Sequence, residues 1–391
     1  MSSITYKIAT CEDNTQKVAE MENQLVKETK PVIVGIKSTS LTEQEKDFLV
    51  RYKPWGIILF HRNIDTTDQL KALTSEINGL LPYEPMIAID LESGLVVNRL
   101  KFLDILQEHR KGPNRQYNPE YQKWLDHGKL GQKYEEAKDE NAKNDIKELV
   151  YRTYYEIGSR LKNFGININL APVLDLSCKA MQCGEENRAF SRNTQTVIDL
   201  GKPAAKGLID AGILPALKHA PGLGTSESVD SHNNTPIVSK DKIDIQTLLN
   251  QHLRPFVEIT EYIKSLGKMP IVMSGHIIYE CLDDKWTIPF SQKALSFLKE
   301  HLAAETRLLT DDLSMGGATK CPGFLLNSTE EVTLPKILKQ AVIASGEAKM
   351  KQIYLCCHEL SGDKQDIERL KEAIELLQGE SFIGKSYSNT V

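Results

Sequence analysis

Residues 214–224 read Leu-Pro-Ala-Leu-Lys-His-Ala-Pro-Gly-Leu-Gly, an apolar run of strand length that ends in polar residues and a turn. A segment of helical period precedes this run at 196–211, and another follows it at 245–266. Short apolar runs that alternate with longer segments of helical period indicate parallel strands joined by helices. The stretch therefore predicts one repeat of a sheet that is buried on both faces.

The same pattern occurs eight times along the chain. The strand-length runs lie at 31–36, 56–60, 86–90, 166–171, 214–218, 270–274, 307–310 and 352–356. The helical segments lie at 42–52, 67–81, 144–164, 196–211, 245–266, 292–304, 331–344 and 366–377. Eight such units, without a Gly-x-Gly-x-x-Gly after the first strand, favour a closed (β/α)8 TIM-type barrel over an open sheet. We expect an α/β fold with a single barrel domain over 31–377, an N-terminal extension over 1–30 and a C-terminal tail over 378–391.

One segment interrupts the repeat. Residues 102–145, between the third and fourth units, are far longer than a usual strand-to-helix connection and are rich in charge. They also contain aromatic residues, among them Tyr117, Trp124 and Tyr134. We expect this insertion to be either a partly helical lid over the barrel mouth, where the carboxyl ends of the strands meet, or a solvated surface insertion.

Composition excludes several classes of protein. The chain of 391 residues is 40% hydrophobic and 26% charged, and its 48 Lys and Arg against 53 Asp and Glu give a net charge of −5. This balance disfavours nucleic acid and anionic membranes as partners. Charges interrupt the first 30 residues, so no signal peptide or membrane span is expected. The seven scattered cysteines suit reduced thiols, and we expect a cytoplasmic protein.

Ionisable residues gather at the predicted strand ends. In a parallel barrel these ends meet at one mouth, where the chemistry of such folds takes place. Burying several charges without a use costs several kcal/mol each. The candidate site therefore comprises Asp90, Asp175, Lys218, His219, His276, Asp311 and Asp312.

Two kinds of chemistry are disfavoured at this mouth. The first strand leads into Lys37-Ser38-Thr39 without a His-x-His pair, and Cys178 and Cys183 lack a second pair at zinc spacing. A nucleophilic serine would need a Gly-x-Ser-x-Gly elbow, which the sequence lacks. Carboxylate chemistry remains, and no metal or cofactor is expected.

The most specific signal is the segment 218–224 followed by Asp230-Ser231-His232. Two glycines and a proline allow the backbone to approach a ligand closely. An aspartate two residues before a histidine can orient the ring and favour its protonated form. Asp230 and His232 could therefore donate a proton and later retrieve it near neutral pH.

Taken together, these segments resemble glycoside hydrolase family 3, in its single-domain bacterial β-N-acetylglucosaminidase type. The family's Lys-His-Phe-Pro-Gly-His-Gly loop, followed after four residues by Asp-Ser-His, is similar to residues 218–232. Its Thr-Asp-Asp-Leu-Ser-Met and Ala-Pro-Val-Leu-Asp segments are matched by 310–315 and 171–175. Further similar segments lie at 56–63, 188–191 and 273–279.

The resemblance implies a role for each matching residue. Asp311 would be the nucleophile and His232 the acid/base, with Asp230 as its partner. Residues that would hold the sugar are Asp90, Arg99, Arg188, Lys218, His219 and His276. The implied enzyme is a retaining exo-β-N-acetylglucosaminidase that releases terminal N-acetylglucosamine (GlcNAc) from cell-wall muropeptide fragments through a covalent glycosyl-enzyme, without a cofactor. Because the chain ends after the eighth unit, we expect the acid to come from the barrel's own loop.

Two segments depart from the family pattern. Residues 90–99 lack the family's Gln, one Gly and first Arg, and Arg99 aligns only after one inserted residue. In the loop, Leu223 replaces a His and 225–229 is one residue longer than usual. Two alternatives stay open: a catalytically weak sugar-binding protein of the same fold, and a family 3 β-glucosidase or β-xylosidase. The sequence does not predict the oligomeric state.

Overall fold

Eight parallel strands close into a barrel in the computed structural model, in the order β1-β12-β11-β9-β7-β4-β3-β2. The structure describes residues 29–92, 126–178, 182–183, 186–224, 239–325, 332–359, 364–375 and 377. The barrel strands are β1 (Lys30–Gly35), β2 (Pro54–Leu59), β3 (Met86–Ile89), β4 (Ile168–Asn169), β7 (Leu214–Ala220), β9 (Ile271–Ser274), β11 (Arg307–Thr310) and β12 (Gln352–Glu359). Each of the eight predicted runs overlaps one of these strands, so the predicted (β/α)8 fold is confirmed.

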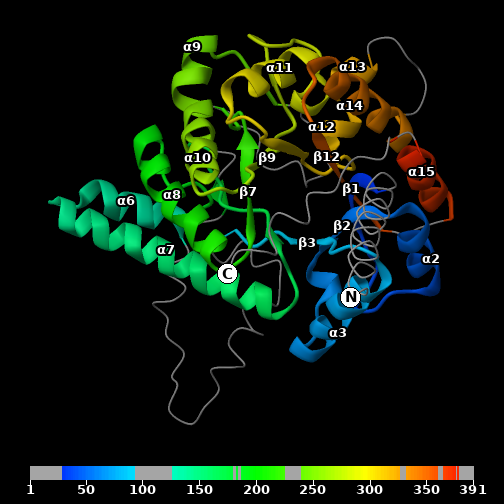
Figure 1. Cartoon of the computed structure of the whole chain (residues 1–391). Coiled ribbons are helices and arrows are strands. Elements are labelled where there is room, and N and C mark those ends of the chain that lie inside the picture. Colours follow the sequence, from blue (N-terminus) through cyan, green and yellow to red (C-terminus); the bar gives the residue numbers. More distant parts are fainter. Residues whose placement is uncertain are drawn as a thin grey trace, which may run out of the picture.

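Helices surround this barrel (Figure 1). They are α2 (Glu43–Tyr52), α3 (Thr67–Leu80), α7 (Glu140–Asn163), α8 (Thr194–Asp210), α10 (Arg254–Ser265), α11 (Gln292–His301), α14 (Leu334–Ala348) and α15 (Lys364–Glu375). One prediction was wrong in detail, because 245–266 is not a single α-helix. A π-helical segment, η3 (Leu248–Leu253), separates the short α9 (Ile245–Thr247) from α10.

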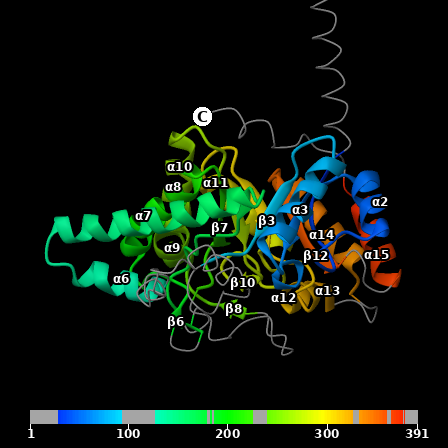
Figure 2. The ribbon, with the colours of Figure 1, turned by 90° about the horizontal axis from the view of Figure 1, so that it is seen from below.

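Smaller elements gather at the mouth end of the barrel. They are β5 (Gln182–Cys183), β6 (Glu186–Asn187), β8 (Ser239–Asp241), β10 (Ile277–Tyr279), α12 (Gly316–Thr319) and α13 (Pro322–Leu325), with the 3-10 turns η1 (His61–Asn63) and η4 (Ile288–Phe290) elsewhere in the chain. Figure 2 shows β6, β8, β10, α12 and α13 on the same side of the molecule. The connections after the strands thus carry most of the additional structure.

The barrel interior is a packed core. Along β1, Ile33 belongs to the interior cluster, whereas Val32 and Val34 pack with the layer of helices. This alternation follows from the two-residue period of a strand. Trp55 is fully buried inside and donates from its indole nitrogen to Thr29 Oγ1 at 3.2 Å. A filled interior leaves chemistry to the mouth.

Part of the predicted insertion is an ordinary packed helix. The helix α6 (His127–Glu136) lies beside α7, which begins within the insertion, and the two project together from one side of the barrel (Figure 2). His127, Leu130 and Tyr134 of α6 are buried. The described end of the insertion is therefore helical and packed, while residues 102–125 lie outside the described residues. No described helix is both long and apolar enough to cross a lipid bilayer.

Candidate active site

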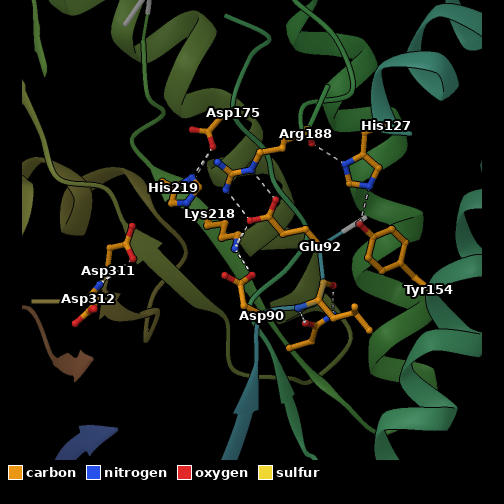
Figure 3. A network of polar contacts seen from close by, with 12 residues as sticks. Asp90, Glu92, His127, Tyr154, Asp175, Arg188, Lys218, His219, Asp311 and Asp312 are labelled. Carbon is orange, nitrogen blue, oxygen red and sulfur yellow. Dashed lines mark hydrogen bonds and ion pairs between the residues drawn. The ribbon is translucent and has the colours of Figure 1, made fainter. Parts of the chain in front are cut away.

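Predicted site residues from separate strands meet at the barrel mouth (Figure 3). Asp90 follows β3, Lys218 and His219 lie in β7, and Asp311 follows β11. Arg188 comes from the segment after β6 and points toward the same place. Strand order explains the convergence, because β3, β4, β7, β9 and β11 are successive neighbours in the barrel.

A buried carboxylate, Glu92, connects the cationic side chains. Its oxygens accept from Arg188 Nε at 2.7 Å and Arg188 Nη2 at 2.6 Å, and from Lys218 Nζ at 2.5 Å. Lys218 Nζ also donates to Asp90 Oδ1 at 2.6 Å. We call Asp90, Glu92, Arg188 and Lys218 the Glu92 cluster. Two cations facing two carboxylates leave the cluster formally neutral.

Each charge in the Glu92 cluster is maintained by its partners. Burial raises the pKa of Glu92, but Arg188 and Lys218 outweigh burial and hold this pKa well below its usual range. Burial lowers the pKa of Lys218, but Asp90 and Glu92 reverse that effect and the pKa is raised. Buried ions need such pairing, because removing one partner leaves an uncompensated charge. Glu92 and Lys218 are therefore both charged near neutral pH.

Asn169 at the end of β4 holds the backbone between Asp90 and Glu92. Its Oδ1 accepts from Leu91 N at 3.0 Å, and its Nδ2 donates to Leu91 O at 2.9 Å. Asn169 is fully buried. Asn169 thereby fixes the main-chain N and O of Leu91. Because Asp90 and Glu92 flank Leu91, this also fixes the directions in which their side chains point.

A second pair, Asp175 and His219, lies beside the Glu92 cluster. Asp175 Oδ2 accepts from His219 Nδ1 at 2.7 Å and from the main-chain N of His219 at 3.1 Å. Its other oxygen accepts from Leu223 N at 2.9 Å. Because a carboxylate only accepts, Nδ1 of His219 carries hydrogen and donates to Asp175.

Asp311 is held differently from the carboxylates of the Glu92 cluster. Within the described residues, its carboxylate accepts a hydrogen bond only from the main-chain N of Asp312, at 2.8 Å. Burial raises the pKa of Asp311, but His219, His276 and Lys218 outweigh burial and lower it. Among the residues described, Asp311 is thus an ionised carboxylate that keeps lone pairs without hydrogen bonds, as a nucleophile requires.

The remaining predicted residues at this end are placed as follows. His276 Nε2 contacts Asp312 O at 2.9 Å, and its buried Nδ1 has no hydrogen-bond partner within the described residues. Asp312 does not cap a helix; its carboxylate accepts from Ser314 N at 2.9 Å and Ser314 Oγ at 2.5 Å. These bonds stabilise the turn that precedes α12, which begins at Gly316.

The glycines of 218–224 make the expected close turn. Gly222 has φ of 111° and Gly224 has φ of 63°, a region that disfavours residues with a side chain. A Cβ on Gly224 would lie 2.2 Å from Asp241 Oδ2. Tyr279 donates from its hydroxyl to Gly222 O at 2.8 Å. The peptide bonds Lys218–His219 and Ala220–Pro221 are cis.

The other three predicted site residues, Arg99, Asp230 and His232, lie outside the described residues. Among the residues described, no three or more His, Cys, Asp or Glu side chains form a group that could hold a metal ion.

Sequence reasoning missed Glu92 and Asn169. Glu92 lies two residues after Asp90, so a strand-end carboxylate with a second one nearby was a usable signal. Asn169 lies in Ile-Asn-Ile-Asn, where a polar residue interrupts an apolar strand run. Neither signal says by itself which backbone or cation the side chain contacts.

Comparisons with known proteins agree with this geometry. Residues 137–376 match the family described as glycosyl hydrolase family 3 N terminal domain. A beta-hexosaminidase of Psychromonas ingrahamii is 30% identical over 347 residues, which cover 88% of this chain and 87% of that protein. Another, of Chromobacterium violaceum, is 31% identical over 290 residues, 74% of this chain and 71% of that protein.

A solved structure with the same fold is native NagZ from Neisseria gonorrhoeae. It superposes with a TM-score of 0.64 at 25% identity and covers 92% of each chain. The family match spans more than half of the chain, and the relatives align over most of their own lengths. The chain belongs to glycoside hydrolase family 3.

Proposed function

We propose that this protein is a retaining exo-β-N-acetylglucosaminidase that removes terminal GlcNAc from muropeptide fragments in the cytoplasm. The observation that carries the proposal is an ionised Asp311 at the same barrel mouth as the paired charges of the Glu92 cluster. Beta-hexosaminidases among the relatives support the substrate class. NagZ of Neisseria gonorrhoeae has been solved with N-trifluoroacetyl-D-glucosamine, which supports a GlcNAc-like ligand.

The chemistry proceeds in two displacements. Asp311 attacks the anomeric carbon as the glycosidic bond breaks, and His232 gives a proton to the departing oxygen. This forms a covalent glycosyl-enzyme. A water molecule, deprotonated by His232, then attacks the same carbon and releases Asp311 and GlcNAc with net retention. Asp230 orients His232.

The Glu92 cluster supplies binding in this scheme. Asp90, Arg188 and Lys218 present an acceptor and two donors from positions fixed by Glu92, so they lose little conformational freedom when sugar hydroxyls bind. Preorganised polar groups of this kind can strengthen their contacts as charge develops on the sugar. His219 and His276 complete the proposed sugar site.

The decisive test traps the intermediate. A fluorinated N-acetylglucosaminide should accumulate the glycosyl-enzyme, and mass spectrometry of the digested protein should find the label on Asp311. A label elsewhere would refute the assignment of the nucleophile. Chromogenic N-acetylglucosaminide should be cleaved faster than the glucoside or the xyloside; the reverse ranking would favour the β-glucosidase or β-xylosidase alternative. Sugar binding without any turnover would favour the binding-protein alternative.

The acid role of His232 has its own test. His232→Ala should reduce turnover by about 10² to 10⁴-fold on substrates with poor leaving groups, because protonation of the leaving oxygen is lost. The loss should be much smaller on substrates whose leaving group needs no proton. Equal losses on both would contradict the role of acid.

A further inference from the structure

The helix α6, within the predicted insertion, is seated directly on the segment that carries Arg188. A Cβ on Gly131 of α6 would lie 1.7 Å from Phe190 O, so only a glycine permits this approach. Nearby, Glu135 Oε1 accepts from Ser191 Oγ at 2.5 Å and from Thr196 Oγ1 at 2.9 Å. The middle and the last turn of α6 therefore support the chain just after β6.

His127, the first residue of α6, reaches Arg188 itself. Its Nδ1 lies 2.8 Å from Arg188 O, and its Nε2 lies 2.8 Å from the hydroxyl of Tyr154 in α7. The ring stacks on Phe190 with centroids 3.9 Å apart. His127 and Tyr154 are 1% and 2% exposed, so both polar contacts are made away from water. Figure 3 shows the two contacts on either side of the ring.

The chemistry of the three partners fixes the proton positions. A carbonyl oxygen only accepts, so His127 Nδ1 must carry hydrogen and donate to Arg188 O. Burial lowers the pKa of His127 to about 4, so the ring is neutral near pH 7 and its Nε2 is an acceptor. Tyr154 therefore donates to Nε2 and selects the tautomer that can hold Arg188.

We propose that His127 and Tyr154 are positioning residues for Arg188: they hold its main chain so that its guanidinium meets Glu92 and the sugar. The guanidinium makes a two-pronged contact with Glu92, which tolerates little displacement of the backbone that carries it. The role in sugar binding rests on the proposed function. The role in ordering Arg188 does not.

The polar pair is not explained by packing alone. Burying a histidine and a tyrosine hydroxyl is unfavourable unless every polar atom is paired, and an apolar pair would fill the same space without that condition. Here each group donates to the next one. Tyr154 donates to His127, and His127 donates to the main-chain carbonyl of Arg188. The arrangement resembles the outer groups that orient the ligands of a metal or the base of a catalytic triad.

The first experiment measures KM and kcat on a chromogenic N-acetylglucosaminide. Tyr154→Phe should raise KM about 3- to 10-fold, the loss expected for one weakened hydrogen bond, with kcat within about twofold. Tyr151→Phe is the matched control, because Tyr151 lies on the same helix and donates to Asp210 on the surface. It should leave KM unchanged. An unchanged KM in Tyr154→Phe, or an equal rise in both variants, would overturn the proposal.

A double-mutant cycle separates positioning from general loss of structure. In an Arg188→Lys background, Tyr154→Phe should raise KM no further, because the residue it positions is gone. An additive rise would overturn the proposal. His127→Asn should keep a KM closer to that of the natural protein than His127→Ala, because its amide can still donate toward Arg188 O. Equal effects of the two substitutions would also count against it.

The second experiment needs no turnover. In 15N-labelled protein, the Nε–H signal of Arg188, assigned by its absence in Arg188→Lys, should exchange slowly with water. Tyr154→Phe should make this exchange at least several-fold faster, and Tyr151→Phe should not. Unchanged exchange would refute the proposal whatever the kinetics. If the natural protein lacks turnover but exchange responds as expected, the proposed function fails while the ordering of Arg188 by this pair stands.

Discussion

Two glutamates in this molecule each bridge a lysine and an arginine, and their surroundings are opposite. Glu92 joins Lys218 and Arg188 at the barrel mouth, with side chains 1%, 2% and 22% exposed. Glu258 in α10 joins Lys202 and Arg254 on the outer helices, with side chains 32%, 35% and 46% exposed. The same three residue types therefore occur once buried and once in water.

The difference separates a functional arrangement from a surface one. An exposed triad contributes about 0 to 1 kcal/mol to stability, because water and salt screen its attraction. A buried triad is costly to form and very costly to break, so folding stability alone gives no reason to keep it. The Glu92 cluster is better explained by what it offers a ligand.

The largest effect is expected at Asp311, which makes no ion pair with any residue that the structure describes. Asp311→Ala should reduce kcat by about 10⁴-fold or more, because the nucleophile is lost. The free energy of unfolding should change by less than about 1 kcal/mol, since Lys218 keeps its contacts with Asp90 and Glu92. Steady-state kinetics and urea unfolding measure the two quantities. Asp312→Ala, one residue away, should affect turnover far less; an equal loss in both would contradict the assignment.

The second prediction compares the two glutamates directly. Glu92→Gln should lower the free energy of unfolding by about 3 to 5 kcal/mol, because it leaves buried cations without their charge partner. Glu258→Gln should lower it by less than about 1 kcal/mol. Urea unfolding at low and high salt measures both. Similar costs for the two variants would show that burial does not distinguish the two triads.

The third prediction concerns pH. Burial lowers the folded-state pKa of His127 from 6.5 to about 4, against weaker opposing effects of the Arg188 carbonyl, Glu92 and Asp126. Between these values the unfolded chain takes up a proton that the folded protein excludes, so stability falls as pH falls through this window. The loss is about 3 kcal/mol. Between pH 7 and pH 4 the free energy of unfolding should fall by about 3 kcal/mol more in the natural protein than in His127→Asn. Urea unfolding at each pH measures this difference. Parallel profiles would contradict the prediction.

The smallest effect is expected for two asparagines that hydrogen-bond the main chain at the two ends of β3. Asn167 bonds Ile87 N and Pro85 O, both at 2.8 Å, just as Asn169 bonds the two main-chain groups of Leu91. Replacing either with alanine should cost about 2 kcal/mol of stability, because main-chain groups lose their partners.

Only Asn169→Ala should also weaken substrate binding, by about tenfold in KM, since Asp90 and Glu92 flank Leu91. Asn167 lies nearer the start of the strand and serves as the matched control. If both variants raise KM equally, Asn169 has no particular role in orienting the two carboxylates.

Much of the fold could be predicted because it depends on local patterns. All eight strand runs and the helices between them follow from apolar periodicity, which the buried strands and one-sided helices require. Residues 245–266 were the exception. A π-helical turn adds one residue without changing the apolar period enough to be visible, so the break at η3 could not be predicted.

The site was predictable to the extent that strand ends determine position. Asp90, Lys218, His219 and Asp311 meet at one mouth because parallel strands end there. Glu92 and His127 were missed for a different reason. Glu92 leaves the strand in a direction set by Asn169, and His127 comes from an insertion whose docking depends on Gly131. Such contacts depend on three-dimensional packing between segments far apart in the sequence.

Gly131 of α6 has a consequence for genetics as well as for structure. Any heavier residue at Gly131 would force the accessory helix to lift from the carbonyl of Phe190. His127 would move with the helix, and the main chain of Arg188 would lose the hydrogen bond from His127 Nδ1. A screen for inactive variants would then identify Gly131, although this glycine packs against Phe190 O. Such a result could be mistaken for evidence that Gly131 belongs to the catalytic site.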